Sequence, residues 1–213
     1  MHPLICVHCG EWDEVPDTDA GTSTLRCASC LRTRPFLRLP LYCVSGPSGT
    51  GKSTIAGMLL ERLRSHFVVL EQDLLWVGGL RDPAHDHRLF RSTWLRTAAM
   101  VQQSGRPVVL CGTVMPPEFE PLPERALFTD VHYLALTCEP DVLAARLRAR
   151  PAWRGWDEER IRENLEFAAW VVDRAEALDP PLTLLDTTRT DPVETAEAVC
   201  GWIGRLQAAA DGT

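Results

Sequence analysis

A run of nine residues that begins at Gly46 has the composition of a phosphate-binding loop. It reads Gly46-Pro47-Ser48-Gly49-Thr50-Gly51-Lys52-Ser53-Thr54. Its glycines permit backbone angles that a Cβ would forbid, so successive N–H groups can turn inward around one phosphate. The Lys52 ammonium would then reach the β- and γ-phosphates, and the Ser53 hydroxyl would ligate Mg²⁺. We therefore expect ATP or GTP to bind here with Mg²⁺, through Gly46, Ser48, Gly49, Thr50, Gly51, Lys52, Ser53 and Thr54.

The segments on either side of this loop supply the context that such a loop requires. Residues 41–45 form a short apolar run, and residues 55–65 repeat apolar side chains at helical spacing. Strand, glycine loop and helix together define the P-loop motif G-x-x-x-x-G-K-S. The motif also explains a bias in composition, because Lys52 is the sole lysine among 22 basic residues. A compact ammonium fits a tight backbone cradle, whereas a planar guanidinium does not.

Two further strand ends carry candidate functional residues. The strand expected at residues 66–70 is followed by Asp73, and the strand expected at 107–111 is followed by Gly112. Ligands of parallel α/β sheets bind beyond the carboxyl ends of the strands. Asp73 is the candidate general base for a hydroxyl acceptor, with Mg²⁺ or substrate positioning and helix capping as alternatives. Gly112 would let the substrate approach the backbone.

A group of arginines follows the helix expected at residues 139–150. Pro151 ends that helix and Gly155 loosens the next few residues, which have the length of a short lid. Arg150 and Arg154 are candidates for clamping the transferring phosphoryl group, so we count them with Lys52 and Asp73 as catalytic candidates. Arg146 and Arg148 are equally well explained as surface residues of the helix.

The stretch between the second and third expected strands is the candidate acceptor site. Residues 76–97 are rich in aromatic and ionisable side chains, of which Arg88 and Arg91 are the candidate acceptor-binding residues together with Asp73 and Gly112. His85 and His87 are two residues apart and do not share a helix face, so we do not expect a metal site there.

The eight cysteines divide into two groups. Four form two C-x-x-C pairs separated by 17 residues, a spacing typical of a four-thiolate zinc site: Cys6, Cys9, Cys27 and Cys30. Residues 11–26 have almost nothing apolar to bury, so the metal must supply the folding energy of this segment. We expect a zinc ribbon with a structural role, and nucleic-acid binding by the ribbon is the alternative. The other four cysteines lie singly among apolar residues and are assigned no function.

Length and charge limit the class of protein. At 213 residues, with 45% hydrophobic and 24% charged residues, the chain suits one domain and a small appendage. We expect the ribbon at residues 1–38 and a P-loop domain at 39–213, with a lid at about 150–158. A net charge of -7 disfavours non-specific binding to a polyanion. The chain has no apolar run of about 18 residues and no leader pattern at its start, so we expect a cytoplasmic enzyme without membrane contact.

The remaining segments alternate as strand and helix, which predicts an α/β fold with a parallel sheet covered on both faces. Strands are expected at residues 41–45, 66–70, 107–111, 131–137 and 182–185. Helices are expected at residues 55–65, 84–104, 139–150, 157–178 and 192–209.

Residues 40–209 resemble the small P-loop kinases, a group that includes gluconate, shikimate and nucleoside monophosphate kinases, chloramphenicol phosphotransferase and polynucleotide kinase. The resemblance implies a P-loop NTPase fold with strand order 2-3-1-4-5, an arginine-bearing lid after the fourth strand, and an acceptor contact by Asp73. The sequence Arg154-Gly155-Trp156-Asp157-Glu158 is loosely similar to the Arg-x-Asp-Asp of nucleotide kinase lids. Residues 185–188 resemble the loop that borders the adenine in such kinases. Adenylate kinases have Asp-Gly where this chain has Cys111-Gly112.

These features favour a Mg²⁺-dependent kinase that transfers the γ-phosphoryl group of ATP or GTP to a hydroxyl of a small, nucleoside-like molecule. The first alternative is a nucleoside monophosphate kinase, which needs no base because its acceptor is already anionic. An alternative of another class is a zinc-ribbon NTPase that binds nucleic acid or a protein partner and uses hydrolysis as a switch. The acceptor, the preferred nucleotide base and the oligomeric state stay open at this point.

Overall fold

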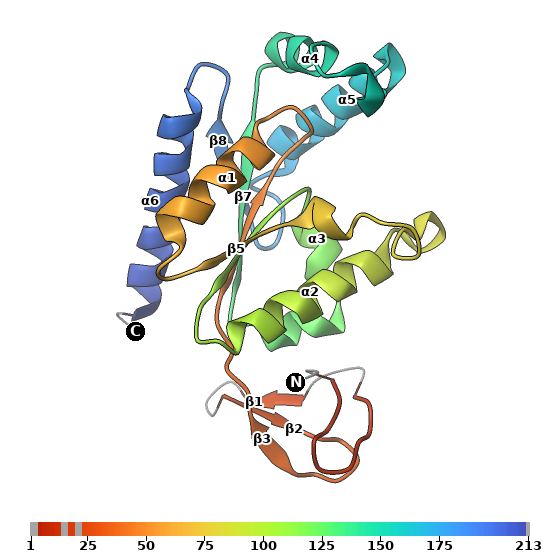
Figure 1. The fold of residues 1–213 in the computed structure, drawn as a ribbon, viewed down its shortest axis with the longest axis vertical. Helices are drawn as coiled ribbons and strands as arrows, with labels where there is room; N and C mark the ends of the chain where they lie inside the picture. Colours follow the sequence, from red (N-terminus) through yellow and green to blue (C-terminus); the bar gives the residue numbers. More distant parts are fainter. Residues whose placement is uncertain (1–3, 14–16, 20–22, 212–213) are drawn as a thin grey trace.

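The computed structural model describes residues 4–13, 17–19 and 23–211, and within these residues the chain forms two β-sheets (Figure 1). The first sheet is small and antiparallel, with β1 (Asp17–Asp19), β2 (Thr24–Arg26) and β3 (Thr33–Pro35) in that order. The second is parallel and five-stranded, with β4 (Leu41–Ser45), β5 (Val68–Glu71), β6 (Val108–Cys111), β7 (Val131–Thr137) and β8 (Leu182–Asp186).

The five parallel strands lie in the order β5-β6-β4-β7-β8. If β4 is counted as the first strand of this sheet, the order is 2-3-1-4-5, which the resemblance to small P-loop kinases implies. The pairing register joins Leu41 of β4 to Val108 of β6 on one side and to Val131 of β7 on the other. The carboxyl ends of the strands therefore lie at one edge of the sheet, where α1 begins directly after the P-loop.

Helices connect the strands and cover the sheet. The α-helices are α1 (Lys52–Leu63), α2 (Arg88–Gln102), α3 (Pro116–Phe119), α4 (Pro140–Arg148), α5 (Glu158–Arg174) and α6 (Pro192–Asp211). Short 3-10 helices are η1 (Gln72–Leu75), η2 (Pro83–His85), η3 (Pro123–Leu127) and η4 (Ala152–Arg154). None of the described helices is long and apolar enough to cross a membrane.

Strand β4 shows why the sheet has helices on both faces. All five of its residues are buried, and side chains alternate between the faces of a strand. Leu41 and Cys43 belong to the apolar cluster that β4 forms with α2 and α5, whereas Tyr42 and Val44 belong to the cluster with α1 and α6. A continuous apolar run is therefore what a central strand between two helical layers requires.

The small sheet packs against the end of the parallel sheet that lies opposite α4 (Figure 1). Leu25 and Phe36 are buried in the same cluster as the α2 side of the large sheet. At the carboxyl end of α2, the Gln103 side chain accepts a hydrogen bond from the Leu37 N–H at 3.0 Å and donates one to the Leu37 carbonyl at 2.9 Å. The region of the small sheet is thus joined to the region of the parallel sheet by a shared apolar core and by paired hydrogen bonds.

One expected helix was wrong at its beginning. The stretch expected as a helix from residue 84 divides into η2 and α2, because Asp86 and His87 both have left-handed backbone angles, with φ of 52° and 54°. The His87 N–H donates to the Asp82 carbonyl at 2.7 Å, and the Asp82 N–H donates to Nδ1 of His87 at 3.1 Å. This closed turn compensates for the unfavourable backbone angles and aims His87 toward the cavity described below.

Candidate active site

The P-loop between β4 and α1 has a backbone that only glycine accommodates at its critical positions. Gly46, Gly49 and Gly51 have φ of 133°, 94° and 99°. A Cβ on Gly46 would lie 2.3 Å from the Leu136 carbonyl oxygen of β7, and a Cβ on Gly49 would lie 2.8 Å from Leu143 of α4. The loop is therefore packed closely against β7 and α4, and it leads directly into the first turn of α1.

Lys52 is held at the mouth of this loop. Its Nζ donates hydrogen bonds to the carbonyls of Gly46 at 2.6 Å and Pro47 at 2.8 Å. Burial lowers the pKa of the Lys52 ammonium to about 8, while the nearby Asp73 carboxylate acts in the opposite direction and Arg150 adds to the lowering. A bound anion would favour the charged lysine, so this ammonium is suited to a phosphate ligand.

Asn164 holds the P-loop by two hydrogen bonds that the sequence did not indicate. The Ser48 N–H donates to Oδ1 of Asn164 at 3.0 Å, and Nδ2 of Asn164 donates to the Ser48 carbonyl at 3.0 Å. Asn164 lies in α5, 116 residues away in the chain. Both backbone groups of one loop residue are thus satisfied by a single side chain, and the loop is tied to the helix that follows the lid.

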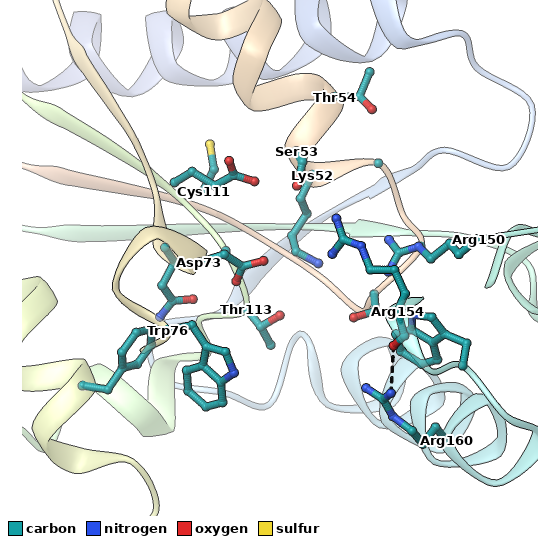
Figure 2. A pocket seen from close by; sticks show the side chains of 18 of the residues that line it. Lys52, Ser53, Thr54, Asp73, Trp76, Cys111, Thr113, Arg150, Arg154 and Arg160 are labelled. Atoms are coloured by element: carbon teal, nitrogen blue, oxygen red, sulfur yellow. Dashed lines mark hydrogen bonds between the residues drawn. The ribbon is translucent and has the colours of Figure 1, made fainter. Parts of the chain in front are cut away.

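A cavity of about 680 Å³ opens next to the P-loop (Figure 2). It is bounded by the P-loop, the residues after β5 and β6, the start of α2, and the lid segment. In Figure 2, Lys52 extends between Asp73 on one side and Arg150 and Arg154 on the other. The residues expected at the site that line this cavity are Ser48, Gly49, Gly51, Lys52, Ser53, Thr54, Asp73, Arg91, Gly112, Arg150 and Arg154.

Three expected site residues do not line this cavity: Gly46, Thr50 and Arg88. Gly46 lies against the backbone of β7, where a side chain would not fit, and it shapes the loop from that side. The Thr50 side chain is 1% exposed and its hydroxyl donates to the Pro47 carbonyl at 2.9 Å, so it points into the protein. Arg88 is exposed on the first turn of α2.

Gly112 has a packing reason to be small, in addition to the approach of substrate, which stays a prediction. A Cβ at this position would lie 2.3 Å from Cβ of Gln72, so the missing side chain makes room for Gln72. Gln72 is 4% exposed, and its backbone carbonyl accepts a hydrogen bond from Nε1 of Trp94 at 3.1 Å. The close approach therefore fixes the turn that presents Asp73.

The segment expected as a lid, residues 150–158, and the first turn of α5 contribute arginines that lie over aromatic rings. The guanidinium carbon of Arg150 lies 5.5 Å from the Trp156 ring centre, and that of Arg160 lies 4.7 Å from it. Arg160 also donates to the Arg154 carbonyl at 3.0 Å (Figure 2). Burial, with Arg154 nearby, lowers the pKa of Arg150. These arginines thus form a preorganised, positively charged side of the cavity.

The other two arginines of this region have different partners. Arg148 forms an exposed ion pair with Glu158 at 2.6 Å. Arg146 donates to the Thr187 carbonyl at 2.8 Å, and the Thr187 hydroxyl donates to the Thr50 carbonyl at 3.2 Å. Together with Thr190 and Thr195, these groups line a second hollow of about 360 Å³ on the far side of the P-loop. The loop after β8 lines this hollow. The resemblance to small P-loop kinases implies that this loop borders the adenine.

The half of the cavity next to α2 contains aromatic residues of the expected acceptor stretch, together with Glu118, which the sequence patterns did not indicate. Trp76 packs edge-to-face against His87 and Phe90, with ring centres 4.7 and 4.9 Å away. Glu118 of α3 pairs with Arg91, and its pKa is raised by burial although Arg91 opposes this effect. A glutamate in a short helix elsewhere in the chain carries no local signal of such a contact. Glu71 also lines the cavity, and its place at a strand end made it detectable.

The four cysteines expected to bind zinc lie together at the amino terminus. Their sulfur atoms all lie within 4.8 Å of one another, with Sγ–Sγ distances of 3.7 Å for Cys6 and Cys30 and 3.6 Å for Cys9 and Cys27. Four thiolates about 2.3 Å from a tetrahedral ion would be about 3.8 Å apart, so the donor set fits Zn²⁺. The N–H of His8 donates to Cys6 Sγ and, with other hydrogen bonds, lowers the pKa of Cys6 to about 6.

Comparisons with known proteins agree with this architecture. A model of the AAA domain family matches residues 43–170. A protein of Thermococcus onnurineus named "Putative adenylate kinase" is 31% identical over 161 residues, which make up 75% of this chain and 81% of that protein. The fold is shared with a sugar kinase from a Janibacter species (TM-score 0.59, 18% identical, 79% of this chain and 95% of that one). It is also shared with a gluconokinase from Sinorhizobium meliloti (TM-score 0.51, 18% identical, 81% and 95%).

The cysteine geometry predicts about one zinc ion per chain. Cys27→Ser should lose the metal and lower the thermal midpoint, because the ribbon shares its core with the α2 side of the sheet. The measurement is elemental analysis of the purified protein together with thermal unfolding. The matched control is Cys200→Ser on α6, which should keep the zinc. Equal zinc content in the two variants would contradict the ribbon site.

The Asn164 contact predicts that this residue positions the P-loop. Asn164→Ala removes two hydrogen bonds of about 1 kcal/mol each, so we expect nucleotide affinity to fall about tenfold or more. Calorimetric titration with Mg·ADP checks this, and Asn164→Asp, which keeps the acceptor for Ser48, should recover part of the loss. Glu163→Ala, an exposed neighbour in α5, is the control. An unchanged dissociation constant in Asn164→Ala would exclude the positioning role.

Proposed function

This chain belongs to the AAA domain family and is a kinase-type P-loop phosphotransferase, and we propose that it transfers the γ-phosphoryl group of ATP or GTP to a hydroxyl of a small, nucleoside-like molecule. One observation carries the proposal. Lys52 and Asp73 line the same cavity and interact electrostatically. In P-loop proteins this lysine binds the phosphates, and the Asp73 carboxylate is suited to the role of general base. Phosphate donor and hydroxyl acceptor can therefore meet between them.

The donor nucleotide is proposed to bind across the P-loop. Its triphosphate would occupy the curve formed by Gly49, Gly51 and Lys52, where N–H groups and the start of α1 favour anions. Its base would lie in the second hollow, next to Thr187 and Thr190. This hollow adjoins the cavity through Gly49, Gly51 and Thr54, which line both. The fit supports a nucleotide that extends from one side of the loop to the other.

The cavity also has donors of the kind that Mg²⁺ requires. The Ser53 hydroxyl and the carboxylates of Glu71 and Asp73 all line it, and hard oxygen ligands of this kind suit Mg²⁺. Bound there with the triphosphate, the ion would neutralise part of the phosphate charge. We propose Ser53 as a direct ligand and Glu71 as a partner of Mg²⁺-bound water, which leaves Asp73 for the acceptor.

The residues that line the cavity then have separate roles in the transfer. The acceptor oxygen attacks the γ-phosphorus, the bond from that phosphorus to the bridging oxygen of the nucleoside diphosphate breaks, and the hydroxyl proton passes to the Asp73 carboxylate. Lys52 stabilises the charge that grows on the bridging oxygen. Arg150 and Arg154 face the same space from the lid segment and would stabilise the transferring group.

A nucleoside monophosphate kinase is the second candidate. The relative from Thermococcus onnurineus supports it, because that protein is named an adenylate kinase and matches most of this chain. Such an acceptor carries its own anionic oxygen, so Asp73 would position substrate instead of accepting a proton. The turnover of an Asp73 variant therefore separates the two candidates.

The ribbon, residues 1–38 in our proposed division of the chain, is given a structural role. The small sheet lies at the end of the parallel sheet opposite α4 (Figure 1), whereas the cavity is lined by the P-loop and the segment after α4, so the proposed zinc site would be remote from the cavity. The alternative of another class is an NTPase that uses the ribbon to bind nucleic acid or a protein. It requires acceptor-independent hydrolysis that RNA, DNA or a protein partner stimulates.

Lys52→Arg is expected to reduce phosphoryl transfer by at least about 100-fold, because the guanidinium does not fit where Nζ is held between two loop carbonyls. Zinc content and thermal stability should stay close to those of the wild type, since the two hydrogen bonds that change lie within the P-loop. The measurement is release of nucleoside diphosphate in the presence of an acceptor panel. Retained transfer would count against the assignment of the P-loop as the donor site.

Asp73→Asn is expected to lower kcat about 100-fold or more while leaving the affinity for Mg·ADP within about threefold, because it removes a proton acceptor and keeps the size of the side chain. Asp173→Asn, an identical change at an exposed position of α5, is the matched control and should have wild-type turnover. Near wild-type turnover in Asp73→Asn would contradict the general-base role and favour an acceptor that is already anionic.

A further inference from the structure

The cavity is electrically divided into two halves. Lys52, Arg150, Arg154 and Arg160 line the half that faces the P-loop and the lid. The half that faces α2 and α3 is lined by Trp76, His87, Phe90, Arg91, Thr113 and Glu118, which we call the acceptor half. Among these described lining residues of the acceptor half, Arg91 is the only arginine or lysine.

Arg91 is already paired with carboxylates on both sides. Its side chain is 13% exposed, and one terminal nitrogen donates to Oδ2 of Asp86 at 2.7 Å. The other terminal nitrogen donates to Oε1 of Glu118. The second oxygen of Glu118 accepts the Met115 N–H at 2.8 Å, which fixes the carboxylate in place. One guanidinium between two carboxylates leaves this cluster without excess positive charge.

The remaining residues of the acceptor half include no carboxylate, lysine or arginine. Nδ1 of His87 accepts the Asp82 N–H at 3.1 Å, which fixes the orientation of the imidazole ring. Trp76 is 37% exposed and is held in place by the rings of His87 and Phe90. Arg81 lies over the Trp76 ring at 5.2 Å, but it is not among the residues that line the cavity.

From this arrangement we propose that the acceptor is an uncharged cyclic alcohol, such as a nucleoside or a sugar, and that the Arg91–Glu118 pair excludes phosphorylated and carboxylated acceptors. The inference rests on the proposed transfer to a hydroxyl group and names its substrate class. An anionic acceptor would meet Glu118 and Asp73 and would have to break the Arg91 ion pairs to gain a cation. A neutral ring instead packs on Trp76 and places a hydroxyl toward Asp73.

In this proposal one carboxylate, that of Glu118, discriminates between neutral and anionic acceptors. Glu118 neutralises Arg91 and adds negative potential at the end of the acceptor half. With glutamine at this position, the hydrogen bond to Arg91 can remain while one negative charge is removed, so Arg91 keeps only the exposed Asp86 carboxylate as its ion-pair partner and the cluster loses its excess negative charge. Glu118 is therefore a specificity-determining residue in this proposal.

The experiment compares matched acceptors that differ by one anionic group: adenosine with AMP, guanosine with GMP, and glucose with glucuronate. Release of nucleoside diphosphate gives kcat/KM, and phosphorus NMR identifies the product. For the wild type we expect the neutral member of a reactive pair to be favoured at least tenfold. In Glu118→Gln this ratio should fall at least tenfold toward the anionic member.

Glu120→Gln is the matched control, because Glu120 directly follows α3 but pairs with Arg125 and Tyr133 outside the cavity lining. Its preference should equal that of the wild type. The wild-type preference alone tests the proposal if Glu118→Gln does not fold.

The proposed transfer and the proposed acceptor class predict different failures. Efficient conversion of AMP or GMP to the diphosphate by the wild type would overturn the uncharged-acceptor inference and leave a phosphotransferase. An unchanged ratio in folded Glu118→Gln would overturn the role of the Arg91–Glu118 pair. Intact Mg·ADP binding without transfer to any member of the panel would overturn hydroxyl transfer and this inference together.

Discussion

The close packing of the P-loop against its neighbours is the constraint on which the site depends. At Gly46 the space for a Cβ is taken by the backbone of β7, and at Gly49 it is taken by leucines of α4. The loop is therefore shaped by two elements that come much later in the chain. Asn164 adds a third contact from α5. Because α4 and α5 also flank the lid segment, the phosphate cradle and the lid arginines are positioned by the same packing.

The sequence predicted the elements of the sheet well because their signal is local. The apolar runs at β4 and β7 were predicted with the observed bounds, and the other three strands differed by one or two residues at their ends. The helix expected from residue 84 was wrong at its beginning, because a turn stabilised by the His87 side chain overrides the periodic pattern. The five-stranded order followed from the resemblance, not from the pattern of residues.

The candidate site was predictable only where its residues belong to a motif or a strand end. The phosphate-binding glycines, Lys52 and Asp73 fall in that class, and their chemical roles stay predictions that activity measurements decide. The Ser48–Asn164 and Arg91–Glu118 pairs join residues 116 and 27 positions apart. Ser48 and Arg91 were candidates from the sequence, but nothing in the local sequence marks Asn164 or Glu118. For Gly112 the approach of substrate stays a prediction, and its close packing against Gln72 is a contact that the sequence did not indicate.

Helix α2 connects two parts of the molecule that have separate chemistry. Its first turns carry Phe90 and Arg91 into the acceptor half of the cavity, and its carboxyl end is followed by Gln103, which is bonded to the backbone at Leu37. Trp94 in the middle of the helix is buried and bonded to the turn that presents Asp73. A helix fixed at its middle and its far end cannot shift its first turns independently. The ribbon is thus remote from the reacting groups, yet its packing helps to hold the wall against which the acceptor would bind.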